Sequence, residues 1–157
     1  RGIVVLFLGV WVLLGCRSAP PKPAAFSLME KTGISFSNTI SNTADFNIFN
    51  YRNFYNGAGV AIGDLNNDGL PEVFFTANMD SNKLFLNKGN FSFEDISEKA
   101  GIGEALKWST GVVLADVNGD GWLDIYVCNA GHQKGQIQDN ALFINNKDLT
   151  FTDKARE

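Results

Sequence analysis

Apolar residues in the second half of the chain occur in short runs separated by turns rich in Gly, Asn and Asp. The run at 73–75 is apolar throughout, which predicts a strand buried on both faces. The alternation of Phe and polar residues at 91–94 instead predicts a strand with one exposed face. Such short runs between turn residues predict antiparallel β-strands. Four of them follow one another, at 59–63, 72–77, 83–87 and 91–96.

The same series of runs appears twice. Segments 59–64 and 72–75 match 111–116 and 124–127 at an offset of 52 (116 minus 64), and 82–87 and 93–95 match 140–145 and 151–153 at an offset of 58 (145 minus 87). The second copy therefore carries extra residues around 131–139. Four antiparallel strands in a unit of about 50 residues are typical of a β-propeller blade. The predicted fold class is all-β, with two four-stranded repeats of an incomplete propeller.

A polar loop lies between the first two runs of each copy. In the first copy, Asp64, Asn66 and Asp68 are loop positions one, three and five, Gly69 permits a sharp bend, and Glu72 is position nine. A hard cation such as Ca²⁺ takes about six to eight oxygen ligands. Without a cation, carboxylates held this close would repel by roughly a few kcal/mol per pair at an effective dielectric of about 20. The loop therefore predicts a calcium site.

The second loop repeats the arrangement, with Asp116, Asn118, Asp120 and Asp124 at the four side-chain positions. Two matches in register favour calcium over the alternative of two polar turns. The loops are not EF-hands, because position twelve, which requires Glu in that motif, is Phe75 or Val127.

The N-terminal region predicts export. Positions 3 to 15 form an uninterrupted apolar run of 13 residues, which is shorter than the roughly 18 residues of a membrane span. The run ends in Leu-Leu-Gly-Cys16, which resembles a bacterial lipoprotein signal and implies a lipid anchor on Cys16. An ordinary signal peptide and an incomplete membrane anchor are the alternatives. The predicted division is a signal at 1–16, a Pro-rich linker at 17–25, a lead-in with one or two irregular strands at 26–56, and repeats at 57–108 and 109–157.

The charge composition bears on which kinds of partner the chain could bind. The 13 basic and 17 acidic residues give a mildly acidic chain, and six of the acids lie in the two loops, so no nucleic-acid surface is expected. If Cys16 is acylated, Cys128 has no disulfide partner, and we expect it to be a buried strand residue.

The sequence does not predict an enzyme. The only histidine, His132, lies in the expanded segment of the second copy and is expected to be exposed. Glu94, Asp95 and Glu98 could be imagined as a hydrolytic pair, but solvent-exposed acids on a strand are commoner. Trp108 and Trp122 are expected to pack within the blades rather than to form a sugar platform.

The motif Gly-Val-Ala-Ile-Gly-Asp-Leu-Asn-Asn-Asp-Gly, followed by Leu-Phe-Leu-Asn-Lys-Gly, resembles the FG-GAP or VCBS repeat, and more narrowly the cartilage-acidic-protein-like (ASPIC/UnbV) family. The resemblance implies a calcium-binding propeller related to the integrin α-subunit head. Glu72 departs from the Asp usual in the repeat, and two units are too few for a ring of at least about four blades, so we expect a fragment. The implied ligands are Asp64, Asn66, Asp68, Leu70 and Glu72, then Asp116, Asn118, Asp120, Trp122 and Asp124, with Leu70 and Trp122 acting through their carbonyls.

These patterns predict a calcium-binding module of an exported, lipid-anchored bacterial envelope protein that binds a protein or glycan ligand, or serves in adhesion or scaffolding. A calcium affinity of about 10⁻⁴ to 10⁻³ M is expected, as in extracellular modules. Two alternatives remain open. The chain could be the non-catalytic part of a carbohydrate-active enzyme, or a surface-layer protein with many tandem repeats.

Overall fold

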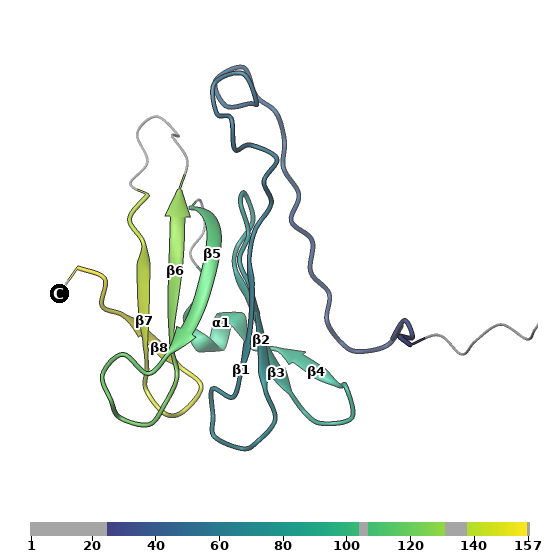
Figure 1. Cartoon of the computed structure of the whole chain (residues 1–157), viewed down its shortest axis with the longest axis vertical. Coiled ribbons are helices and arrows are strands. Elements are labelled where there is room, and N and C mark those ends of the chain that lie inside the picture. The colour runs from purple at the N-terminus through teal and green to yellow at the C-terminus, as the bar shows by residue number, and fades with distance from the viewer. Residues whose placement is uncertain (1–24, 104–106, 131–137, 157) are drawn as a thin grey trace, which may run out of the picture.

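The computed structural model describes residues 25–103, 107–130 and 138–156, and it is almost entirely β (Figure 1). Two four-stranded antiparallel sheets, ordered β1-β2-β3-β4 and β5-β6-β7-β8, stand side by side. The predicted fold class is confirmed. The elements are β1 (Val60–Gly63), β2 (Glu72–Phe75), β3 (Lys83–Asn87), β4 (Phe93–Asp95), α1 (Ser97–Ala100), β5 (Trp108–Ala115), β6 (Asp124–Ala130), β7 (Ala141–Asn145) and β8 (Phe151–Asp153).

The main core lies between the two sheets. The pairing registers place Ala61, Phe74 and Leu84 on one face of the first sheet and Ile125 and Phe143 on one face of the second. Because Phe74, Leu84, Ile125 and Phe143 are all buried in one cluster, these two faces pack against each other. Ile96, Ala100 and Ile102, in and around α1, are buried in the same cluster. The connection between the sheets therefore helps to fill their interface.

Strand β1 approaches β5 closely because glycines flank its apolar residues. A Cβ atom added to Gly63 would lie 2.7 Å from Leu114 Cδ1, and one added to Gly59 would lie 2.9 Å from the Thr110 carbonyl oxygen. Asn78 joins the sheets near the same strands, since its Nδ2 donates to the carbonyls of Gly57 and Ser109, each at 3.0 Å. Small residues and one buried amide thus set the spacing between the sheets.

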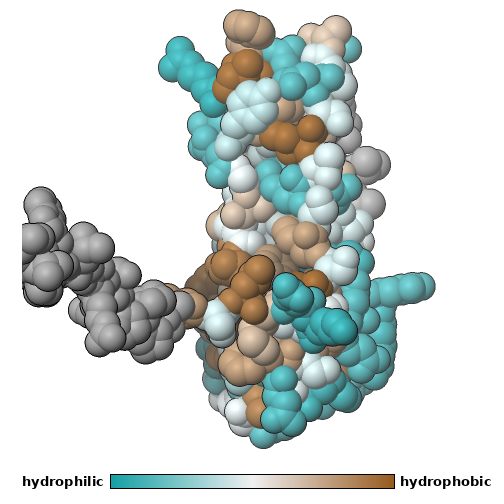
Figure 2. Space-filling view, turned by 90° about the vertical axis from the view of Figure 1, so that its right-hand side faces the viewer, coloured by the Kyte–Doolittle hydropathy of each residue, from teal (hydrophilic) through white to brown (hydrophobic). Residues whose placement is uncertain are grey.

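The lead-in differs from the prediction, because residues 26–56 contain turns and bends but no strand. The chain instead runs along the side of the first sheet that faces away from the second (Figure 1). The Phe93 amide of β4 donates to the Thr32 carbonyl at 2.7 Å, and the ring of Phe36 stacks on Phe75 at 4.7 Å. Figure 2 looks onto this side, where apolar and polar residues both reach the surface.

A second aromatic cluster fixes the end of the lead-in. Phe46 and Phe54 pack around Trp108, which is buried in this cluster with the lead-in and not within the blade core, where it was predicted. The ring of Phe46 meets that of Trp108 edge to face at 4.9 Å. This arrangement is a favourable geometry for aromatic rings. The lead-in is therefore held to the first residue of β5 as well as to the first sheet.

Two strand predictions need correction. Strand β4 begins at Phe93, whereas Phe91 has a φ of 57° and belongs to the turn that the Ser92 amide closes by donating to the Gly89 carbonyl. Cys128 lies in β6 but is exposed. It occupies the face of the second sheet that points away from the first, opposite Gly111, so an apolar run alone did not reveal its exposure.

Several predictions lie outside the described residues: the signal at 1–16 with Cys16, the linker up to residue 24, and His132. Within the described ranges, the single helix α1 has 4 residues, and no helix there has the length and hydropathy of a bilayer span.

Candidate metal site

The first polar loop, between β1 and β2, folds around its own side chains. Asp64 Oδ1 accepts a hydrogen bond from the Asp68 amide at 3.1 Å, and Asp64 Oδ2 accepts one from the Gly69 amide at 2.8 Å. Asn66 Oδ1 accepts from the Asp68 amide at 3.1 Å, and Asp68 Oδ1 accepts from the Leu70 amide at 2.7 Å. The carboxylate at position one therefore accepts hydrogen bonds from the amides at positions five and six, on the other side of the loop.

The second loop, between β5 and β6, has the same bonds at the corresponding positions. Asp116 accepts from the amides of Asp120 and Gly121 at 3.0 and 2.9 Å. Asn118 Oδ1 accepts from the Asp120 amide at 2.9 Å, and Asp120 Oδ1 accepts from the Trp122 amide at 3.0 Å. Both loops thus adopt one conformation, which their shared side chains dictate.

Glycine is needed at the bend of each loop. Gly69 and Gly121 have φ values of 84° and 85°, in the left-handed region that residues with a Cβ rarely adopt. In each loop this glycine comes directly after the aspartate at position five. The predicted role of Gly69 as the bending residue is therefore confirmed, and Gly121 has the same conformation in the second loop.

The residues at position nine are buried beneath the loops. Glu72 accepts from the amides of Leu65 and Asn87 at 2.8 and 3.4 Å, and Asp124 accepts from the amides of Val117 and Asn145 at 3.1 and 2.8 Å. Each carboxylate therefore connects position two of its own loop with the last residue of the third strand in the same sheet. Sequence reasoning had assigned these residues only as metal ligands.

The environment of Glu72 disfavours its charged form. Burial raises the pKa of the Glu72 carboxyl above its ordinary value, and the nearby carboxylates of Asp68 and Asp64 raise it further. The hydrogen bonds from the Leu65 and Asn87 amides oppose this shift without cancelling it. A positive charge in the loop would relieve this repulsion.

The second loop has a contact with a cationic side chain. Lys147 Nζ lies 3.2 Å from Asp120 Oδ2, whereas the corresponding position in the first copy (147 minus 58) is Gly89. Burial would raise the pKa of the Asp120 carboxyl, but the Trp122 amide and the Lys147 ammonium group lower it below its ordinary value. The second loop thus has a cationic side chain that the first lacks.

The loops also touch each other. Asn145 Nδ2 donates to the Leu65 carbonyl of the first loop at 2.8 Å and to the Leu123 carbonyl beside the second at 3.0 Å. Asn67 Nδ2 donates to the Gly121 carbonyl at 3.2 Å. No role is predicted for Asn145 from the sequence, although its recurrence as Asn87 in the first copy marks this position as one that both repeats share.

The predicted ligands are therefore gathered into two adjacent loops at one end of the sheets (Figure 1). Side-chain oxygens of Asp and Asn are hard donors of the kind that calcium prefers. Across the described residues, however, no group of three or more His, Cys, Asp and Glu side chains has a metal-binding arrangement. One reason is that Glu72 and Asp124 point to backbone amides. Leu70 is exposed and Trp122 is half-buried.

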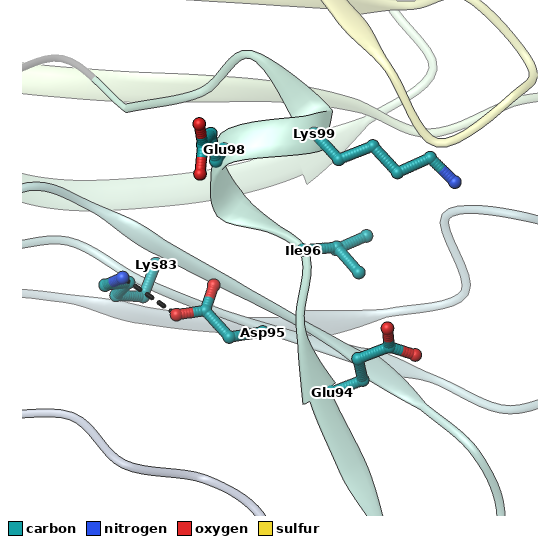
Figure 3. A pocket seen from close by; sticks show the side chains of 6 residues that line it. All are labelled: Lys83, Glu94, Asp95, Ile96, Glu98 and Lys99. Atoms are coloured by element: carbon teal, nitrogen blue, oxygen red, sulfur yellow. Dashed lines mark hydrogen bonds and ion pairs between the residues drawn. The ribbon is translucent and has the colours of Figure 1, made fainter.

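The acids considered as a hydrolytic pair lie around a pocket beside α1 (Figure 3). Asp95 points toward Lys83, with Nζ to Oδ2 at 2.8 Å, while Glu94 points to the other side (Figure 3). Burial would raise the pKa of the Asp95 carboxyl, but hydrogen bonds from Lys83 and Ser97 lower it. A carboxylate paired in this way is a poor proton donor.

Comparison with known proteins agrees with this repeated architecture. Residues 64–127 match the FG-GAP-like repeat family, a segment that includes both loops. This segment is an FG-GAP-like repeat, as the resemblance predicted. It is similar to cartilage acidic protein 1 of Xenopus tropicalis, with 37% identity over 73 residues, which is 46% of this chain and 11% of the relative. The mouse and human proteins of that name are 36% and 34% identical over the same length. The chain spans about a tenth of these relatives.

Proposed function

We propose that each loop binds one Ca²⁺ ion and that the two ions stabilise the end of the sheet pair. The observation that carries this proposal is the identical folding of two loops whose apolar residues differ. The residues that would hold the ions are Asp64, Asn66, Asp68 and the Leu70 carbonyl in one loop, and Asp116, Asn118, Asp120 and the Trp122 carbonyl in the other.

Glu72 and Asp124 stay in the proposed ligand set. A carboxylate has about four acceptor sites on its two oxygens, so one backbone hydrogen bond to each oxygen leaves capacity for a cation. Burial and the nearby carboxylates of Asp68 and Asp64 raise the pKa of Glu72, and a cation bound near position nine would oppose this shift. A bound cation would also neutralise the repulsion among the three acids.

Calcium would act here as a structural ion. An ion that binds only the folded state adds stability by mass action, about 2.7 kcal/mol at a concentration 100 times the Kd. Because Asn67 and Asn145 connect the two loops, an ion in either loop would also hold the sheets together. We further propose that the module presents a binding or scaffolding surface for a protein or glycan and is not an enzyme.

Isothermal titration calorimetry tests the calcium assignment. The unmodified chain is expected to bind about two Ca²⁺ ions, and Asp64→Asn and Asp116→Asn are each expected to remove one. Asn removes the charge and keeps one oxygen that can accept a loop amide, while its NH₂ group replaces the second acceptor oxygen. Glu30→Gln is the matched control, because it removes one acid from the exposed lead-in. A stoichiometry unaffected by the loop variants would reject the assignment.

We propose export and lipid anchoring through Cys16 as the cellular setting. The support is the apolar run that ends at Cys16 in a bacterial lipobox-like sequence, followed by prolines. Labelling with a clickable fatty acid in bacteria that express the whole protein tests this proposal. Cys16→Ala should abolish labelling and release the protein from membranes, whereas Cys128→Ala should leave both unchanged. Equal labelling of both variants would exclude an anchor at Cys16.

A further inference from the structure

Asn145, the last residue of β7, lies between the two polar loops and forms hydrogen bonds with both. Its backbone amide donates to Asp124 Oδ1, at position nine of the second loop, at 2.8 Å. Its side-chain amide donates to the Leu65 carbonyl of the first loop at 2.8 Å, and the Leu65 amide donates to Glu72 Oε2 at 2.8 Å. Since Glu72 is position nine of the first loop, the two position-nine carboxylates are connected through Asn145 and Leu65.

The position of Asn145 is closely fixed by its other contacts. Asn145 is 3% exposed. Its Nδ2 also donates to the Leu123 carbonyl at 3.0 Å, and its Oδ1 accepts from the Lys147 amide at 2.8 Å. A buried polar group that loses its hydrogen-bond partner is costly. A displacement of the Leu65 carbonyl would therefore also displace Asn145 and the residues bonded to it.

The corresponding residue of the first repeat, Asn87 (145 minus 58), shows which of these bonds is additional. The Asn87 amide donates to Glu72 Oε1 at 3.4 Å, as the Asn145 amide donates to its own position-nine carboxylate. Asn87 Nδ2 donates to the Pro71 carbonyl at 3.0 Å, within the first repeat. The bond to Leu65 is therefore the one that Asn145 makes beyond the pattern common to both repeats.

A second bond between the loops lies at the surface. The exposed Asn67 donates from Nδ2 to the Gly121 carbonyl at 3.2 Å. The Gly121 amide in turn donates to Asp116 Oδ2, at position one of the second loop, at 2.9 Å. Because water can replace a hydrogen bond at an exposed site, we expect the buried bond through Asn145 to matter more.

We propose that Asn145 couples the two loops, so that an ion held by one loop raises the calcium affinity of the other. This inference rests on the proposed calcium function. Asp64 and Glu72, which would hold an ion in the first loop, lie on either side of Leu65, one as its chain neighbour and one as its hydrogen-bond acceptor. Fixing both of them also fixes the Leu65 carbonyl against Asn145.

The same connection explains the direction of the effect. With the Leu65 carbonyl fixed, Asn145 is held in place, and its backbone amide keeps Asp124 oriented beneath the second loop. The residues common to both sites are then already ordered when the second loop takes its ion, which therefore binds more tightly. By thermodynamic linkage, each loop raises the affinity of the other by the same factor.

Repulsion between two divalent ions acts in the opposite direction. Asp68 and Asp120 of the two loops are exposed, so water and salt screen this repulsion, with a Debye length of about 8 Å at about 0.15 M ionic strength. The hydrogen bonds of Asn145 are buried and depend much less on salt. We therefore expect the favourable effect to prevail at this ionic strength.

The test measures a coupling factor by calorimetry with Ca²⁺ alone as the ligand. This factor is the product of the two association constants of the unmodified chain, divided by the product of the constants of each loop measured alone. Asp116→Asn leaves only the first loop to bind, and Asp64→Asn leaves only the second. The unmodified chain should give a coupling factor of about five or more.

Two matched variants assign the coupling to Asn145. Repeating the three measurements with Asn145→Ala should bring the coupling factor close to one. Asn87→Ala is the control, because it removes the corresponding bonds within the first repeat but no bond between the loops. It should weaken the first loop and leave the coupling factor unchanged.

The outcomes separate the coupling from the calcium assignment. Two bound ions with a coupling factor of one would overturn the coupling and leave the calcium assignment standing. An unchanged factor in Asn145→Ala, or an equal loss in Asn87→Ala, would also overturn the role of Asn145. A chain that binds no calcium would reject the proposed function and the coupling with it.

Hydrogen exchange tests the coupling without any change at Asn145, in case Asn145→Ala does not fold. In Asp116→Asn only the first loop would hold calcium. Calcium should then slow exchange of the Asn145 backbone amide several times more than exchange of the Ser109 amide, which donates to the Ala77 carbonyl at the other end of β5. Equal slowing of the two amides, or no slowing of either while calcium is bound, would overturn the proposal.

Discussion

The side-chain amide of Asn145 lies 2.8 Å from the carbonyl oxygen of Leu65, a residue 80 positions earlier in the chain. The same amide also donates to the Leu123 carbonyl. One buried side chain therefore connects the first loop, the second loop and the third strand of the second sheet. These hydrogen bonds join the two repeats at the loop end.

Replacing Asn145 with Ala should destabilise the chain. The substitution leaves the buried Leu65 carbonyl without its donor, and a buried unsatisfied group costs about 1–3 kcal/mol. Asn146→Ala is the matched control, because Asn146 is the exposed neighbour and a surface change usually stays within about 0.5 kcal/mol. Urea unfolding of both variants measures the difference. Equal stabilities would show that the bridge contributes nothing.

Truncation at equivalent loop positions should have unequal effects. Leu65→Ala removes a side chain that is 1% exposed, and Leu→Ala in a core costs about 2–5 kcal/mol. Val117→Ala at the counterpart position, 52% exposed, should change the free energy of unfolding by less than about 0.5 kcal/mol. Chemical denaturation of the two variants measures the change in the free energy of unfolding that each substitution causes. A large loss of stability from Val117→Ala would mean that Val117 is covered in solution.

Lys147 should weaken calcium binding by the second loop. Its ammonium group lies 3.2 Å from Asp120 Oδ2, where it competes with a cation for the same carboxylate. Lys147→Met should strengthen the affinity of the second loop by roughly two- to fivefold, as expected for loss of one exposed ion pair, and leave the first loop unchanged. Calorimetry in the Asp64→Asn background isolates the second site, and Lys88→Met, an exposed lysine paired with Glu94, is the control. No gain in affinity would contradict competition by Lys147.

Acid should weaken the contact between β3 and β4 through Asp95. The hydrogen bonds from Lys83 and Ser97 hold the folded-state pKa of Asp95 below its ordinary value of 3.8. The stability that this carboxylate contributes is therefore present above that ordinary value and is lost as the pH falls through the lowered folded-state pKa. Asp95→Asn should lower the denaturation midpoint at pH 7 and flatten its decline toward pH 3. If the variant and the unmodified chain had the same pH profile, Asp95 would not be a cause of the loss of stability in acid.

The sequence predicted the sheets well because both repeats alternate short apolar runs with turn residues. Strand β3 matches its predicted bounds, and β1 and β2 lie within theirs. The same patterns could not show which face of a strand is covered. Cys128 lies in an apolar run like that of Thr76 but is exposed, because coverage depends on a neighbouring sheet.

The loop side chains were likewise predicted from their spacing, but their connections were not. The hydrogen bonds of Glu72 to Leu65 and Asn87, and of Asn145 to Leu65, join residues that only the pairing of strands brings together. The lead-in failed as a strand prediction for a related reason. Its aromatic residues pack on Phe75 and Trp108 instead of pairing through the backbone.

The most direct test of the central claim is thermal unfolding of the chain with excess Ca²⁺ and with a calcium chelator. Calcium should raise the melting temperature of the unmodified chain, raise it less in Asp64→Asn and in Asp116→Asn, and leave it unchanged in the double variant. An identical melting temperature with calcium and chelator, at calcium concentrations well above about 10⁻³ M, would contradict calcium binding by the two loops.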